Sequence, residues 1–213
     1  MANIWHLIDT RRSIRSFKDI PVEQQVWGRL ATIVGQSPSS GNLHNVKCIV
    51  VEQQKHKERL ASACYAQVWI AQAPLVFVLT ANTEYIKQYY GQRGAEVFTH
   101  QDTAAAAMAI QLAAHDVGLA SCWVSSFDEA QVRHALDIPD NQLPCIVLPL
   151  GYPAESVPTP ARPRAESYVF RETFGNKIED VNVVYGRSSA IIQKTHQHTK
   201  KYIKDLVSAF WKR

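Results

Sequence analysis

The sequence has no long hydrophobic run. No stretch of about 18 or more uncharged apolar residues occurs, so no membrane-spanning helix is predicted in the 213 residues. The first residues, 1–6, lack the basic-then-apolar order of a secretion signal. With 46% hydrophobic and 20% charged residues, the composition also excludes a disordered or collagen-like chain. We therefore expect a globular, cytoplasmic protein of one domain, or of one domain with an appendage.

Cysteine is scarce, and its pattern indicates neither a metal site nor a disulfide scaffold. No CxxC pair occurs, and no histidine lies beside a cysteine at metal-ligand spacing. His196 and His198 are two residues apart in a predicted helix and so face different sides. The cysteines lie mostly in apolar segments, where a thiol acts as a small hydrophobic group: Cys48, Cys64, Cys122 and Cys145. No metal is predicted.

Positive charge is sparse in the body of the chain and concentrated at its end. Residues 186–213 contain seven basic residues and one acid, a net charge of +6, whereas the preceding residues carry 16 basic and 18 acidic side chains. A basic tail is typical of a nucleic-acid contact, but also of the solvated face of a terminal helix. Because the tail lacks an arginine bias and interleaved exposed aromatic residues, we expect no nucleic-acid partner, and the lack of a long apolar run predicts no membrane partner.

Helical and apolar segments alternate over the first 150 residues. Four apolar runs without strict alternation predict interior strands at 46–51, 75–80, 121–124 and 145–150. Helical patterns lie at 22–34, 55–65, 99–117 and 128–136. Gly35 is the expected end of the first helix, a Thr99-x-x-Asp102 box the expected cap of the third, and Asp128 the cap of the fourth. Helices around one sheet predict an α/β or α+β sandwich.

The amino-acid composition changes after Gly151. Residues 152–163 contain four prolines and predict an extended surface strap. Residues 189–211 have the pattern of a basic amphipathic helix, which needs a surface of its own core or of a partner subunit to dock on.

The densest group of polar side chains lies near the N-terminus. Arg11, Arg12, Ser13 and Arg15 place three guanidinium groups and a hydroxyl within five residues. Such a set offers many donors to a phosphate dianion. A solvated basic turn is the structural alternative, and phosphorylation of Ser13 is a third interpretation.

Two further segments offer polar contacts. The loop 37–42 has small residues that let the backbone approach a planar ligand, together with hydroxyl and amide groups that meet polar ring edges. Arg162 and Arg164, at the end of the proline strap, offer another phosphate contact. Each segment taken alone is equally typical of an ordinary surface loop.

Five motifs in this order resemble the FMN-dependent nitroreductase family, over residues 3 to about 165. They are the arginine-rich segment 11–15, the loop Pro38-Ser39-Ser40-x-Asn42, Ala73-Pro74 at the start of a strand, Gly118-Leu119-x-Ser121-x-Trp123 after the long helix, and Gly151-Tyr152-Pro153-Ala154-Glu155 before the strap. The resemblance implies an α+β fold with a mostly antiparallel sheet flanked by helices. It also implies an FMN-binding domain at 1–165 and a C-terminal extension at 166–213, docked or exchanged at the interface of a homodimer.

The resemblance also implies which residues hold FMN. The phosphate and ribityl chain would be held by Arg11, Arg12, Ser13 and Arg15, with Arg162 or Arg164 as the later basic contact. The isoalloxazine would be lined, largely from the other subunit, by Pro38, Ser39, Ser40 and Asn42. Gln67 falls near the position of an amide at the pyrimidine edge, where the family usually has Asn. Val124, Ser125 and Ser126 match the turn whose backbone N–H reaches flavin N5, although the family often has Gly there.

The implied activity is reduction of nitroaromatic or quinone-like compounds by NAD(P)H, in a ping-pong scheme. The flavin carries the hydride chemistry, so no catalytic side chain is predicted. The sequence has no GxGxxG motif, and NAD(P)H is expected to bind transiently over the flavin. Aromatic residues in 84–98 are expected to set specificity or simply to pack between helices. Alternatives are a dehalogenase, a flavin-cleaving enzyme or an azoline oxidase of the same fold, or an FMN carrier without turnover.

Overall fold

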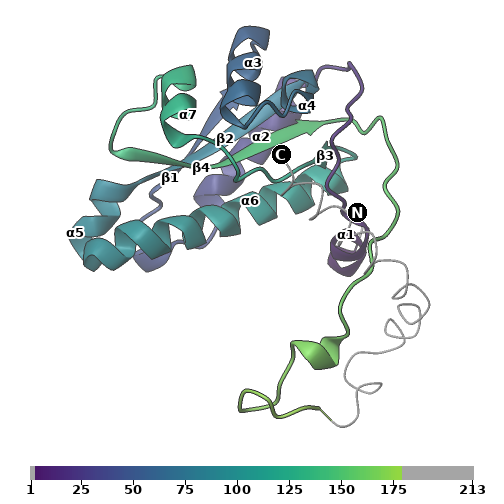
Figure 1. Cartoon of the computed structure of the whole chain (residues 1–213), viewed down its shortest axis with the longest axis vertical. Helices are drawn as coiled ribbons and strands as arrows, with labels where there is room; N and C mark the ends of the chain where they lie inside the picture. The colour runs from purple at the N-terminus through teal and green to yellow at the C-terminus, as the bar shows by residue number, and fades with distance from the viewer. Residues whose placement is uncertain (1–2, 179–213) are drawn as a thin grey trace, which may run out of the picture. The chain divides into compact units, whose positions relative to one another are not determined.

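The structure is a computed structural model that describes residues 3–178 (Figure 1). The chain divides into two compact units, Met1–Val157 and Pro158–Arg213. The first unit is built on a four-stranded antiparallel sheet in the order β1-β2-β4-β3. Its strands are β1 (Val46–Val51), β2 (Leu75–Asn82), β3 (Ala120–Ser121) and β4 (Gln142–Gly151). The predicted α+β class with an antiparallel sheet is confirmed.

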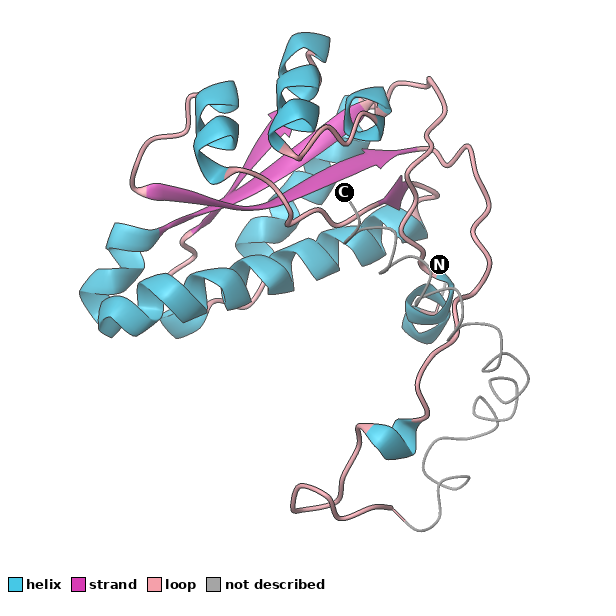
Figure 2. Ribbon diagram, in the orientation of Figure 1, coloured by secondary structure: helices cyan, strands magenta, loops and turns pink. Residues whose placement is uncertain are grey.

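Helices cover both faces of this sheet (Figure 2). One face packs on α2 (Gln24–Gln36) and α6 (Thr99–Asp116), and the other on α3 (Gln54–Ala63), α4 (Trp69–Gln72) and α7 (Glu129–Leu136). Successive β2 residues point to opposite faces, so Phe77 joins the first core and Val78 the second. Both are fully buried. Burial on both faces explains why the strand sequences show continuous apolar runs.

The third predicted strand is shorter than expected. Of the range 121–124, only Ser121 belongs to β3, which pairs with Leu150 of β4. Val124 forms an isolated bridge with Val147 after two residues outside the strand. The first predicted helix is longer than expected, because α2 continues through Gly35 to Gln36. A glycine in a right-handed conformation does not end a helix, and the Gly35 stop was wrong.

The predicted cap of the long helix is also wrong. The chain is already helical before Thr99, because α5 (Thr83–Arg93) runs into a π-helical turn, η2 (Gly94–Phe98), that leads directly into α6. The Thr99 hydroxyl donates to the carbonyl of Gly94 at 3.2 Å, and Asp102 bonds outside its helix. Asp128 does cap α7, since its side chain accepts from the Gln131 N–H at 3.0 Å.

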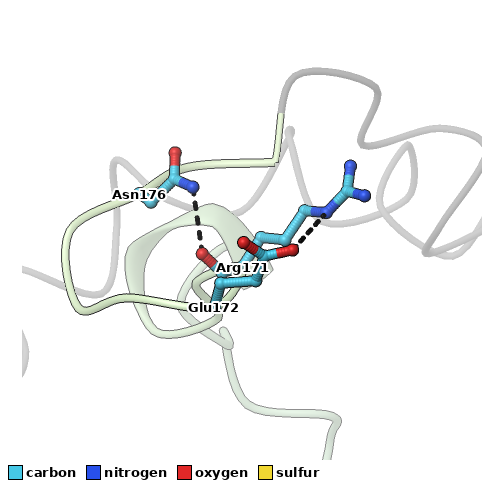
Figure 3. Close-up of polar contacts among 3 residues, drawn as sticks. All are labelled: Arg171, Glu172 and Asn176. Atoms are coloured by element: carbon cyan, nitrogen blue, oxygen red, sulfur yellow. Dashed lines mark hydrogen bonds and ion pairs between the residues drawn. The ribbon is translucent and has the colours of Figure 1, made fainter.

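The second unit is described up to residue 178. It contains an extended segment, the short helix η3 (Ala165–Ser167) and a turn closed by a bridge between Phe170 and Lys177. In that turn Asn176 donates to the Arg171 carbonyl at 3.0 Å, and Arg171 lies 3.9 Å from the Glu172 carboxylate (Figure 3). The helix predicted at 189–211 and the whole basic tail, residues 186–213, lie outside the described residues. Within those residues, no helix combines the length and apolar character that spanning a membrane requires.

Candidate functional site

The arginine-rich segment lies along the edge of the sheet. It follows α1 (Ile4–Thr10), and it joins the sheet through a parallel bridge between Ser13 and Ser121 and a bond from the Ile14 N–H to the Ser121 carbonyl at 3.1 Å. Ile14 is buried, whereas Arg15 is exposed. Arg11, Ser13 and Arg15 all lie near the thiol of Cys122, the residue that follows Ser121.

A pocket of about 290 Å³ opens beside this segment. Arg11 and Arg12 line it together with Gln111 and His115 of α6 and with Glu155. The Arg12 guanidinium donates to the carbonyls of Asp9 and Arg11, both at 2.7 Å, so part of its donor capacity serves the local backbone. Gln111 donates to the Ser121 hydroxyl at 3.0 Å and ties α6 to the same edge.

Glu155 shows that this edge already binds a carboxylate. Its Oε1 accepts from the backbone N–H of Arg15 at 2.6 Å and of Ser16 at 3.0 Å. The Arg15 guanidinium lies 5.7 Å from the centre of the Trp69 ring, a cation–π contact. Sequence reasoning placed Glu155 in a motif but gave it no role, and it missed Trp69. Both are visible only once residues far apart in the sequence lie side by side.

The turn at 124–126 and Gln67 lie in segments that meet the same edge. Val124 exchanges backbone hydrogen bonds with Val147 at 3.0 and 2.9 Å, and the exposed Ser125 and Ser126 follow directly. Gln67, two residues before Trp69, donates its amide to the Cys64 carbonyl at 2.9 Å. That bond uses one N–H of the Gln67 amide, and its oxygen is an acceptor group.

Cys122 is buried beside the arginine-rich segment. Burial raises the pKa of its thiol, although Arg15 and a hydrogen bond with Ser13 act in the opposite direction. The thiol is therefore held neutral and is no nucleophile at neutral pH.

The loop 38–42 lies elsewhere, at the N-terminal end of α6. Asp102 Oδ1 accepts from the Ser40 N–H at 3.0 Å and from the Ser40 hydroxyl at 2.9 Å. Gly41, Asn42 and His44 have positive φ angles of 57°, 58° and 48°. Side-chain bonds within the loop support this backbone, which left-handed geometry otherwise makes costly for residues other than glycine. Neither Asp102 nor His44 was expected in the site; the one signal was a lone acid in an alanine-rich helix.

The long helix separates the two groups of predicted site residues. Asp102 meets the loop 38–42, and His115 meets Thr10 of α1, with 2.8 Å between His115 Nε2 and the Thr10 hydroxyl. His115 follows Asp102 by 13 positions, a separation of roughly 20 Å along an α-helix. One chain therefore brings the segment 11–15 together with Ser121, Cys122 and Trp69, whereas its loop 38–42 meets the other end of α6.

Arg162 and Arg164 belong to the second unit. Both are exposed, and the Arg164 carbonyl accepts from the Ser167 N–H at 2.9 Å and hydroxyl at 2.7 Å. Which of the two meets a phosphate stays a prediction.

The match to a family model agrees with this architecture. The model of the Nitroreductase family matches residues 8–77 and 62–152, which together span most of the first unit. The chain belongs to the nitroreductase family. It is therefore an oxidoreductase, as the motifs predicted.

Named relatives of this nitroreductase-family chain support the same placement. The chain is 26% identical over 192 residues to an FMN reductase [NAD(P)H] of Bacillus subtilis, covering 84% of this chain and 77% of that protein. It is 27% identical over 177 residues to an NADPH-dependent oxidoreductase of Staphylococcus aureus, covering 76% and 69%. Among solved structures, a nitroreductase family protein of Clostridium novyi superposes with a TM-score of 0.66 at 28% identity, covering 83% and 97%.

Proposed function

We propose that this protein is an FMN-dependent oxidoreductase that uses NADH or NADPH to reduce nitroaromatic or quinone-like compounds. The observation that supports it most strongly is the segment 11–15. Arg11, Ser13 and Arg15 all lie near Cys122, in a segment that is joined to the sheet at Ser121. That donor set suits a phosphate dianion at one end of a ligand and a flat ring at the other. The residues present therefore fit FMN.

The proposed roles follow from where the side chains lie. Arg11 and Arg15 bind the phosphate by charge, and Ser13 donates or accepts at the ribityl chain. The backbone N–H groups of Ser125 and Ser126 are offered to N5, and the Gln67 oxygen to a ring N–H. When bound, FMN supplies the hydride-transfer chemistry between NAD(P)H and the acceptor. The chain's own part is to bind the ring, orient it and leave one face open.

The site is proposed to be completed by a second copy of the chain. The loop 38–42 and the segment 11–15 of one chain meet α6 at points roughly 20 Å apart. One chain therefore does not place both groups on the same part of a ligand. In a two-fold dimer the loop of one subunit is free to meet the arginine-rich segment of the other, and each dimer then holds two FMN sites. This arrangement supports the homodimer implied by the motifs.

The function is tested with purified protein and FMN. We expect a yellow protein whose flavin absorption bleaches when NADPH or NADH is added without oxygen, and returns when a quinone or nitroaromatic compound is added. A protein that binds no FMN contradicts the proposal. A protein that binds FMN but is reduced by neither nicotinamide supports the carrier or a specialised flavin enzyme instead.

The phosphate assignment has its own variant. Replacing Arg11 and Arg15 together by Ala removes two charge-assisted contacts of about 1.5–3 kcal/mol each, so FMN affinity should fall at least about a hundredfold. Lys47→Ala with Lys55→Ala is the matched control, because both lysines are exposed on β1 and α3. Equal FMN affinity in the arginine variant and this control contradicts the assignment. Affinity is measured by fluorescence titration.

A further inference from the structure

We infer that Asp102 is a positioning residue that turns Ser40 into a pure hydrogen-bond acceptor, so that Ser40 meets a donor group of FMN and not its phosphate. This inference rests on the proposed function, because FMN is the ligand. The donor groups of FMN are the ring N3–H and the ribityl hydroxyls, whereas its ring carbonyls and its phosphate accept.

Asp102 lies in the first turn of α6, and its side chain is only 6% exposed. Its Oδ1 takes both donors of one residue, the Ser40 N–H at 3.0 Å and the Ser40 hydroxyl at 2.9 Å. Bonds to a carboxylate are stronger than bonds between neutral groups. Ser40 is therefore fixed in both backbone and side chain.

Stability alone does not explain a carboxylate at position 102. Among the described residues, Asp102 Oδ2 is one of the buried side-chain atoms without a hydrogen-bond partner. A buried polar atom left in this way costs free energy, more so when it is charged. A sequence that keeps such a group against a local rule of folding does so most often at functional sites. In this chain the Asp102 carboxylate fixes the conformation of Ser40 in the loop 38–42.

The hydroxyl and amide protons of the loop 38–42 determine which of its groups are donors and which are acceptors. A serine hydroxyl has one proton, and Ser40 donates it to Asp102, so only its lone pairs remain for a ligand. Ser39 accepts from the His44 N–H at 3.0 Å and keeps its own proton as a donor. The Asn42 amide oxygen lies 2.9 Å from His44 Nε2; an amide oxygen only accepts, so the imidazole donates and the Asn42 NH₂ group remains a donor.

The loop 38–42 therefore offers both acceptors and donors to a ligand, and the buried Asp102 determines which of these Ser40 offers. Ser40 offers an acceptor, while Ser39 and Asn42 offer donors. A phosphate needs donors, so an acceptor that is itself bonded to a buried carboxylate is unfavourable next to it. A flavin N3–H or a ribityl hydroxyl is the complementary partner. Loss of the Asp102 carboxylate would free the Ser40 proton and remove this complementarity.

The test compares FMN binding by wild type, Asp102→Asn, Ser40→Ala and the double variant. Asp140→Asn, in an exposed turn, is the control for loss of one acid. We expect Asp102→Asn and Ser40→Ala each to weaken FMN binding by about tenfold. The double variant should be no weaker than the worse single one, because both changes remove the same contact. The visible-region circular dichroism of bound flavin, which reports ring placement, should change in Asp102→Asn and not in Asp140→Asn.

N3-methyl-FMN identifies the donor that Ser40 meets. If the partner is N3–H, wild type and Ser40→Ala should bind this analogue equally. If it is a ribityl hydroxyl, the roughly tenfold loss in Ser40→Ala should persist. Either result supports an acceptor role.

Three outcomes overturn the inference. One is unchanged FMN affinity and dichroism in Asp102→Asn, and another is a double variant whose loss is the product of the single losses. Should Asp102→Asn fail to fold by thermal unfolding, Ser40→Ala carries the test, and FMN affinity equal to wild type overturns it. If wild type binds no FMN, the proposed function falls as well. If wild type binds FMN and the variants do not differ from it, only the role of Asp102 falls.

Discussion

Gly41 is the residue at which the loop 38–42 meets α5. Its φ of +57° lies in the left-handed region, and a Cβ added there would overlap the Tyr90 hydroxyl and lie 3.3 Å from Tyr90 Cζ. Tyr90 in turn packs edge-to-face on Phe98, with ring centroids 5.2 Å apart. Tyr85, Tyr89 and Tyr90 are exposed, so their packing between helices is not seen in this chain, and Tyr90 contacts the loop 38–42.

Replacing Gly41 by Ala should lower the free energy of unfolding by about 1–3 kcal/mol, because it adds left-handed strain and a clash. Adding Tyr90→Phe should recover the part due to the hydroxyl. Gly118→Ala is the matched control, since Gly118 has a φ of +80° with no atom within 4 Å of an added Cβ. The loss of stability caused by Gly118→Ala should be the same with and without Tyr90→Phe. Denaturant unfolding checks this, and equal effects of Tyr90→Phe in both backgrounds would refute the clash.

At the scale of elements, α6 links both groups of site residues. Its N-terminal end holds the loop 38–42 through Asp102, and its C-terminal end holds α1 through His115 and Thr10. The Thr10 hydroxyl donates to the His6 carbonyl at 2.6 Å, so its single proton is used and His115 Nε2 is the donor to Thr10. Burial lowers the pKa of His115, the positive charges of His6, Arg11 and Arg12 lower it further, and Asp116 raises it.

His115 should therefore make the fold less stable in acid. Because its pKa in the folded state lies below the ordinary value of 6.5, its neutral form contributes fully above pH 6.5 and the contribution is lost as the pH falls below it. We expect the melting temperature to fall between pH 7.5 and pH 5.5 by a few degrees more in wild type than in His115→Gln. Identical pH profiles of thermal unfolding in the two proteins would rule out this role.

The sequence predicted most elements, and part of what it missed depends on contacts between segments far apart in the chain. The strand at 46–51 has the predicted bounds, and Asp128 caps α7, because apolar runs and N-caps act within a few residues. The Thr99–Asp102 pattern looked like a cap, but Asp102 makes a tertiary contact with Ser40, and Thr99 bonds to Gly94 in the preceding helical turn. Glu155 was missed for the same reason as the Asp102 contact, because its partners Arg15 and Ser16 lie far away in the sequence.

At the scale of the whole molecule, the proposed dimer gives each flavin residues from two chains. The segment 11–15 of one subunit and the loop 38–42 of the other form one site, and the reverse pair forms the second. A variant in the segment and a variant in the loop therefore damage different halves of the same site. Symmetry makes this arrangement testable without a structure of the dimer.

Mixing two defective dimers should restore intact sites. A subunit with Arg11→Ala and Arg15→Ala keeps an intact loop, and a subunit with Ser40→Ala and Asn42→Ala keeps an intact arginine-rich segment. After unfolding and refolding a one-to-one mixture, about half the dimers are hybrids, and each hybrid has one site with both halves unaltered. Roughly a quarter of all sites should then bind FMN with wild-type affinity, measured by titration. If each chain instead forms its own site, refolding restores none, and the mixture binds as the average of its two components.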